Sequence, residues 1–182
     1  MSTNADYDRA YLRYAFDLLE RYLLSDDLYW QVSLKAPKGA PPYPSLTPGN
    51  ILLSLRRLKA RGAADDFQAE LEAAKAKWGA HWRQKEEREA NARFRQWKDF
   101  LTQYGQEADE PAPYYHYEVR ERVILRLLEE DLGDLPPEVA VGLRKLDEIL
   151  RASFAPGEFI WEPDLQPAFP RDEFWFLYGT LK

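Results

Sequence analysis

The sequence has no cysteine, only two histidines and no glycine-rich phosphate-binding loop. Without cysteine it forms no disulfide and no thiolate metal site, which is compatible with a reducing compartment. His81 is followed four residues later by Lys85, which is not a metal ligand. His116 is followed two residues later by Glu118, and on a helix that pair faces apart. We therefore expect no bound metal and no cofactor.

Catalytic motifs are also missing, since no Gly-x-Ser-x-Gly stretch and no metalloprotease pattern occurs. These absences favour a non-catalytic protein over an enzyme. One hydrolytic arrangement stays open, because two carboxylates distant in the sequence can converge in the fold.

The chain has no long hydrophobic run and no export signal. No segment approaches the roughly 18 continuous apolar residues of a membrane-spanning helix. The first residues, MSTNADYDRAYLRY, lack the basic-then-apolar pattern of a signal peptide. We expect a cytoplasmic protein that does not enter a membrane.

Aromatic residues are abundant by contrast, with 6 Trp, 11 Tyr and 9 Phe among 182 residues. Such side chains supply large areas for burial or for binding. With 45% hydrophobic residues, the chain is long enough to bury one sizeable core. We predict an all-α fold over residues 1–182, a single-domain bundle of five or six helices.

Apolar residues recur at helical spacing in several stretches, and good helix formers fill the positions between them. The clearest start is at Thr47 and Pro48, since Thr is a favourable N-cap and Pro suits the first helical position. The predicted helices span residues 5–24, 48–61, 64–104, 114–131 and 135–152.

The first predicted helix carries four tyrosines on one stripe. The stripe is either a shelf for a ligand or part of a core whose hydroxyl groups reach the rim. Its members are Tyr7, Tyr11, Tyr14 and Tyr22.

The stretch 64–104 contains no proline and is the longest predicted helix. Its segment 83–93 has no large apolar residue, and a helix that is polar all round either crosses solvent or is unstable alone. We therefore expect one long, partly solvent-spanning helix that projects from the body, or two helices broken near Gly79 or Asn91.

The connecting segments have distinct compositions. Residues 28–34 alternate like a strand but lack an obvious partner, so an extended segment and a short helix are both open. Residues 35–48 form a proline-rich loop, either a stiff connector on the helices or a ligand for polyproline-recognising domains. Residues 105–113 read as an acidic linker.

The net charge is −6, yet residues 75–98 carry 8 Lys and Arg against 3 Glu. Cations interleaved with tryptophans can neutralise phosphates and stack on unpaired bases. An alternative functional prediction is therefore a nucleic-acid-binding accessory factor. The contacts would come from Arg83, Lys85, Arg88, Arg93 and Arg95.

Residues 153–182 combine many aromatic residues with four prolines. Because prolines interrupt regular structure, we predict an irregular C-terminal arm. It docks on the helical body of its own chain, or on another subunit or partner. Interfaces favour Trp, Tyr and Phe, so our first functional prediction is a protein–protein interaction or accessory protein that self-associates. The predicted partner-binding residues are Trp161, Phe174, Trp175 and Tyr178.

Overall fold

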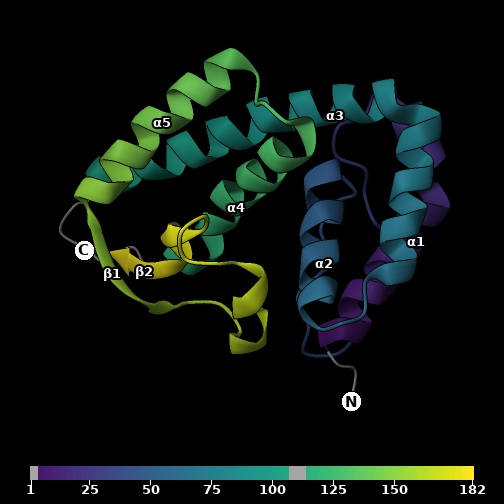
Figure 1. The fold of residues 1–182 in the computed structure, drawn as a ribbon, viewed down its shortest axis with the longest axis horizontal. Helices are drawn as coiled ribbons and strands as arrows, with labels where there is room; N and C mark the ends of the chain where they lie inside the picture. The colour runs from purple at the N-terminus through teal and green to yellow at the C-terminus, as the bar shows by residue number, and fades with distance from the viewer. Residues whose placement is uncertain (1–3, 107–113) are drawn as a thin grey trace. The chain divides into compact units, whose positions relative to one another are not determined.

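The computed structural model describes residues 4–106 and 114–182 (Figure 1). These residues are mostly helical, with a small two-stranded sheet, which confirms the all-α class. Of the predicted linker 105–113, residues 107–113 lie outside the described part. The elements are α1 (Asn4–Leu23), α2 (Pro48–Ala60), α3 (Asp65–Gln106), α4 (Tyr115–Leu132), α5 (Pro137–Ala152), β1 (Phe154–Phe159), η1 (Pro163–Ala168), η2 (Trp175–Leu177) and β2 (Tyr178–Leu181).

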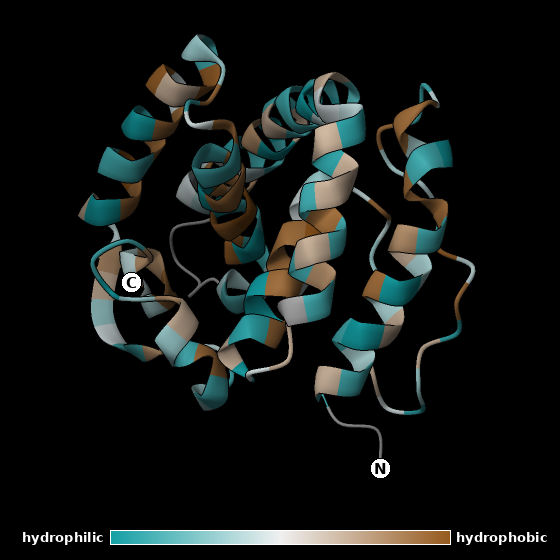
Figure 2. Cartoon of the chain, turned by 45° about the vertical axis from the view of Figure 1, so that its right-hand side comes forward, coloured by the Kyte–Doolittle hydropathy of each residue, from teal (hydrophilic) through white to brown (hydrophobic). Residues whose placement is uncertain are grey.

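The chain divides into two compact units, Met1–Glu89 and Ala90–Lys182. The boundary falls inside α3, so this helix contributes residues to both units. Apolar and polar bands alternate along the helices, as amphipathic helices require (Figure 2). Each unit buries apolar side chains of its own. The prediction of a single domain over 1–182 stays a prediction.

In the first unit, α1 and α2 pack together around buried apolar side chains. α2 begins as predicted, because the hydroxyl of Thr47 accepts a hydrogen bond from the N–H of Asn50 at 3.1 Å. Pro48 occupies the first helical position, where a missing N–H costs nothing. The helix ends at Ala60, and Gly62 follows with a φ of +69°, which glycine adopts without strain.

The four tyrosines of α1 each use their hydroxyl group to hold the main chain of the segment between α1 and α2. Three hydroxyls donate to carbonyl oxygens, and the fourth accepts from a backbone N–H. The structure therefore agrees with a core whose hydroxyl groups reach the rim. The pairs are Tyr7 with Pro42 (3.1 Å), Tyr11 with Ser45 (3.0 Å), Tyr14 with Ser33 (3.2 Å) and Tyr22 with Leu28 (2.7 Å).

The same segment contains no helix over residues 28–34, so the short-helix interpretation was wrong. Trp30 and Leu46 instead form an isolated antiparallel β-bridge. Further along, the ring of Tyr43 stacks on that of Tyr7, with centroids 4.4 Å apart. The proline-rich loop thus lies against α1 as a connector.

α3 is bent at Trp78, whose φ of −123° and ψ of 26° interrupt the helical conformation. The kink lies beside Gly79, one of the two predicted break points. The helix continues through Asn91 without such an interruption. The break near Gly79 is therefore confirmed, and the break near Asn91 was wrong.

The polar segment 83–93 of α3 was expected to cross solvent. In the structure one of its faces is buried, so for that face the expectation was wrong. Charged side chains are buried where partners satisfy them. The carboxylate of Glu89, for example, accepts hydrogen bonds from the hydroxyl of Thr47 and the N–H of Gly49, both at 2.7 Å. The buried members are Lys85, Glu86, Glu89 and Arg93, each at most 5% exposed.

In the second unit, the C-terminal arm is more regular than predicted. β1 and β2 pair antiparallel, with an irregularity after Pro156, and the short helices η1 and η2 lie between them. The prolines did not prevent this, because Pro156 stands at the irregularity and Pro163 at the first position of η1. The arm predicted to be irregular thus contains a two-stranded sheet and two short helices.

The arm docks on its own unit, which agrees with the intramolecular mode of docking. The hydroxyl of Tyr115 on α4 donates to the carbonyl oxygen of Phe176 at 2.6 Å, and both side chains are buried. The guanidinium of Arg126 on α4 donates to the carboxylate of Glu173 at 3.0 Å. These contacts make the arm part of the core of this unit.

Candidate interaction surface

Two of the predicted partner-binding residues lie inside the second unit. Phe174 is 0% exposed and packs edge-on against Phe169, with ring centroids 5.1 Å apart. Tyr178 is 5% exposed, and its hydroxyl donates to the carbonyl oxygen of Phe169 at 2.7 Å. In this conformation both side chains stabilise the arm and present little area to a partner.

The two predicted tryptophans are half-buried. Trp175 lies under Arg151, whose guanidinium carbon is 3.8 Å from the ring centroid. The indole N–H of Trp161 donates to the carbonyl oxygen of His116 at 3.0 Å, and its ring packs edge-on against Phe169. Trp161 is thereby fixed beside the first turn of α4 with part of its ring open to solvent.

Tyr114, which directly precedes α4, and the first turn of that helix add exposed aromatic side chains that were not among the predicted partner-binding residues. Tyr114 is 64% exposed and Tyr117 is 67% exposed. His116 is also exposed, and its ring centroid lies 3.7 Å from that of Tyr117. We call Tyr114, His116, Tyr117 and Trp161 the aromatic surface.

A signal for this surface was present in the sequence. Tyr115, Val119 and Val123 are buried at helical spacing along α4. Tyr114 and Tyr117 fall off that stripe, so a helix that buries the stripe leaves both rings outside. Trp161 lies beside them because its indole N–H donates a hydrogen bond to His116, which is 45 residues away in the sequence. No local sequence pattern indicates such a contact.

Three carboxylates lie close in the sequence to members of the aromatic surface. Glu118 is half-buried next to Tyr117, and burial raises the pKa of its carboxyl, with a further contribution from the nearby Glu121. Glu158 and Glu162 flank Trp161 in the sequence, and both are exposed. An aromatic surface with neighbouring carboxylates attracts cations by two mechanisms, ring quadrupoles and ionic charge.

Two of the five predicted nucleic-acid contacts are buried. The ammonium of Lys85 donates to the carbonyl oxygens of Ser25, at 2.7 Å, and Asp27, and burial lowers its pKa. The guanidinium of Arg93 donates to both carboxylate oxygens of Glu121 at 3.0 and 3.1 Å. In the structure both cations bind groups of the protein itself.

The other three cations are exposed. Arg83 forms an ion pair with Glu87 at 3.1 Å, one helical turn away. Arg88 donates to the carbonyl oxygen of Asp26 at 3.0 Å. Arg95 is exposed as well. The predicted basic surface is therefore reduced to three side chains.

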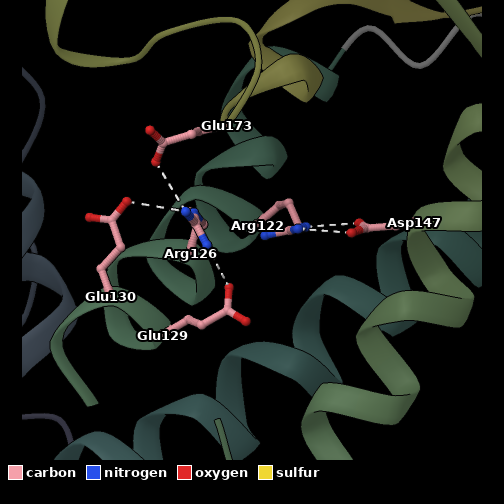
Figure 3. Close-up of polar contacts among 6 residues, drawn as sticks. All are labelled: Arg122, Arg126, Glu129, Glu130, Asp147 and Glu173. Atoms are coloured by element: carbon pink, nitrogen blue, oxygen red, sulfur yellow. Dashed lines mark hydrogen bonds and ion pairs between the residues drawn. The ribbon is translucent and has the colours of Figure 1, made fainter. Parts of the chain in front are cut away.

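Two clusters of ion pairs also lie in the second unit, one around the buried Arg122 and one around the partly exposed Arg126 (Figure 3). Two nitrogens of Arg122 donate to the two carboxylate oxygens of Asp147 on α5, both at 2.8 Å. One turn further along α4, Arg126 is surrounded by three carboxylates. These belong to Glu129 at 3.0 Å, Glu130 at 3.5 Å and Glu173 at 3.0 Å. Arg122 links α4 to α5 and Arg126 links α4 to the arm, which indicates a role of both clusters in stability.

Within residues 4–106 and 114–182, no three histidine or carboxylate side chains come together in a way that could bind a metal ion. None of the helices described is both long and apolar enough to cross a membrane. No protein-family model matches the chain, and neither a curated protein nor a solved structure shows significant similarity to it.

Proposed function

We propose that this chain is a non-catalytic protein that binds protein, including a second copy of itself, through the aromatic surface. The observation that carries the proposal is the exposure of Tyr114 and Tyr117, at 64% and 67%, beside the fixed and half-buried Trp161. Tyrosine and tryptophan are enriched at the energetic centres of protein interfaces.

The surface is pre-organised for binding. Tyr117 projects from a regular helical turn, and the hydrogen bond from Trp161 to the backbone of α4 holds the indole in one position. Side chains that are fixed before binding lose less conformational entropy when the complex forms. Trp161 can therefore act as an anchor without a prior rearrangement, beside the exposed rings of Tyr114 and Tyr117.

The test is the mass of the purified protein by light scattering over a wide range of concentrations. In self-association through the aromatic surface, the mass rises with concentration for the wild type and not for Tyr114→Ala/Tyr117→Ala. The control is Leu24→Ala, which removes a side chain that is 53% exposed in the first unit. A mass that rises equally in all three proteins would place the interface elsewhere, and a monomeric wild type would exclude self-association.

The alternative prediction, a nucleic-acid-binding accessory factor, now involves only Arg83, Arg88 and Arg95 at the surface. No geometric observation favours it. Anisotropy of labelled DNA and RNA at low salt tests it directly, and loss of binding in an Arg88→Glu variant would support it.

A further inference from the structure

We infer that the aromatic surface binds a cationic peptide segment, one rich in lysine or arginine, through the faces of its rings and the neighbouring carboxylates. The inference rests on the proposed function and specifies the chemistry of the partner. It depends on the charge of the second unit and on the place of the rings within it.

The two units differ strongly in charge. Met1–Glu89 contains 13 Asp and Glu against 14 Lys and Arg, a net charge of +1. Ala90–Lys182 contains 18 Asp and Glu against 11 Lys and Arg, a net charge of −7. The aromatic surface belongs to the acidic unit, so a cationic partner is attracted to it and an anionic partner is repelled.

The local arrangement agrees with the overall charge. Glu118 lies in the first turn of α4, and its N–H donates to the carbonyl oxygen of Tyr114, which precedes the helix, at 3.0 Å. Glu158 lies three residues before Trp161, which limits their separation to about 10 Å along the chain. One of these carboxylates thus belongs to α4 and the other to the arm, as do the rings of Tyr117 and Trp161.

The rings supply the second half of the recognition. An ammonium or guanidinium group is attracted to the face of a Tyr or Trp ring, and each such contact at an exposed site changes the association constant by about two- to fivefold. The arm itself contains this interaction, since Arg151 lies 3.8 Å from the ring centroid of Trp175 and Arg171 lies 4.7 Å from that of Tyr178. Those rings are covered by the protein's own arginines, whereas Tyr114 and Tyr117 remain exposed.

The charge also restricts self-association through this surface to an asymmetric contact, in which the surface of one copy binds a basic stretch of the second. A symmetric dimer would place two units of net charge −7 face to face, and the repulsion would oppose association. A cationic segment avoids this repulsion, whether it belongs to another protein or to a basic stretch of a second copy.

The test is fluorescence anisotropy of a labelled octapeptide of alternating arginine and glycine, titrated with the full chain. The wild type should bind it, and the affinity should fall as salt is added. An octapeptide with glutamate in place of arginine should not bind. Tyr114→Ala/Tyr117→Ala should lower the association constant about 4- to 25-fold, as two ring contacts are lost. Tyr114→Phe/Tyr117→Phe should retain binding, because phenylalanine keeps the face of the ring.

Glu118→Gln and Glu138→Gln form a matched pair for the ionic part. Both remove one negative charge from the second unit, but Glu138 lies in the first turn of α5, which follows the C-terminal end of α4. Binding should weaken in Glu118→Gln and remain unchanged in Glu138→Gln. If peptide binding weakened equally in both variants, the effect would come from the net charge of the unit and not from the position of Glu118, and the inference would be overturned.

The same samples separate this inference from the proposed function. If the mass depends on Tyr114 and Tyr117 but no variant changes peptide binding, the surface is an interface and its cationic specificity is wrong. If neither the mass nor peptide binding depends on these two residues, both proposals fail.

Discussion

The carboxylate of Glu89 lies at the N-terminus of α2, where it accepts a hydrogen bond from the N–H of Gly49 at 2.7 Å. The first N–H groups of a helix lack partners within the helix, and the helix dipole favours a negative charge at this end. Glu89 supplies that charge from α3, forty residues further along the chain.

We predict that Glu89→Ala lowers the free energy of unfolding by about 3 kcal/mol, because the hydroxyl of Thr47 and the N–H of Gly49 both lose a charged acceptor inside the protein. Urea denaturation measures the change. Glu87→Ala, two residues away on the same helix, should cost less than about 0.5 kcal/mol, since its pair with Arg83 is exposed. An equal loss of unfolding free energy in the two variants would show that the hydrogen bonds of Glu89 at the start of α2 do not stabilise the protein.

The two arginines of α4 lead to opposite expectations. Arg122 is buried, and within the described residues its carboxylate partner is Asp147 alone. Asp147→Ala should therefore cost about 2–3 kcal/mol, because a buried cation is left without its counter-charge. Arg126 keeps two carboxylates in Glu129→Ala, so that variant should cost less than about 1 kcal/mol. Thermal unfolding of the variants Asp147→Ala and Glu129→Ala measures both effects. A larger loss of stability in Glu129→Ala than in Asp147→Ala would contradict this expectation.

A close approach of α5 to α3 makes Gly142 sensitive to any added side chain. A Cβ atom at this position would lie 2.3 Å from the Cζ atom of Phe94. Gly142→Ala should lower the free energy of unfolding by about 1–2 kcal/mol, because the ring must move aside. Gly79→Ala is the control, since no atom lies within 4 Å of its added Cβ, and there alanine should be neutral or stabilising by up to about 1 kcal/mol.

Alkaline pH should destabilise the protein through its buried tyrosines. Burial raises the pKa of Tyr115, and burial together with the charge of Glu89 raises the pKa of Tyr22. In the unfolded chain both hydroxyls ionise near pH 10, whereas in the folded protein they stay protonated. The unfolded state then binds fewer protons than the folded state, so stability falls as the pH rises above about 10.

The variant Tyr115→Phe isolates one of these two groups. At neutral pH it should be about 1 kcal/mol less stable, because the hydrogen bond to Phe176 is lost. Its decline above pH 10 should be shallower than that of the wild type, since Tyr115 no longer contributes to it. Urea unfolding at a series of pH values measures both effects, and parallel curves for the two proteins would contradict the assignment to Tyr115.

Local sequence signals predicted most of the helices. Thr47 and Pro48 mark the start of α2, and Gly133, with a φ of +85°, follows the end of α4. Such signals act within a few residues, so a single sequence is enough to detect them. The kink near Gly79 was likewise predicted from a local signal, the glycine itself.

Contacts between distant residues explain the errors. The burial of Glu89 depends on Thr47, and the pairing of β1 with β2 joins Phe154 to Leu181. Segment 83–93 has no large apolar residue, so we expected it to be exposed. Its charged groups have partners elsewhere in the chain, and a single sequence does not reveal such partners. The aromatic surface was incomplete for the same reason, because Trp161 meets α4 only in the folded unit.

The tyrosines of α1 hold the following segment by its main chain, since their partners are the carbonyl oxygens of Leu28, Pro42 and Ser45 and the N–H of Ser33. Carbonyl oxygens are present whatever the side chain. Mutations in most of this segment can therefore accumulate without loss of its anchorage, whereas each tyrosine hydroxyl has no substitute among the natural residues that fit a core. At these hydrogen bonds evolutionary constraint thus falls on the tyrosines, and within the segment it falls on the few side chains that pack inward, such as Tyr43 and Leu46.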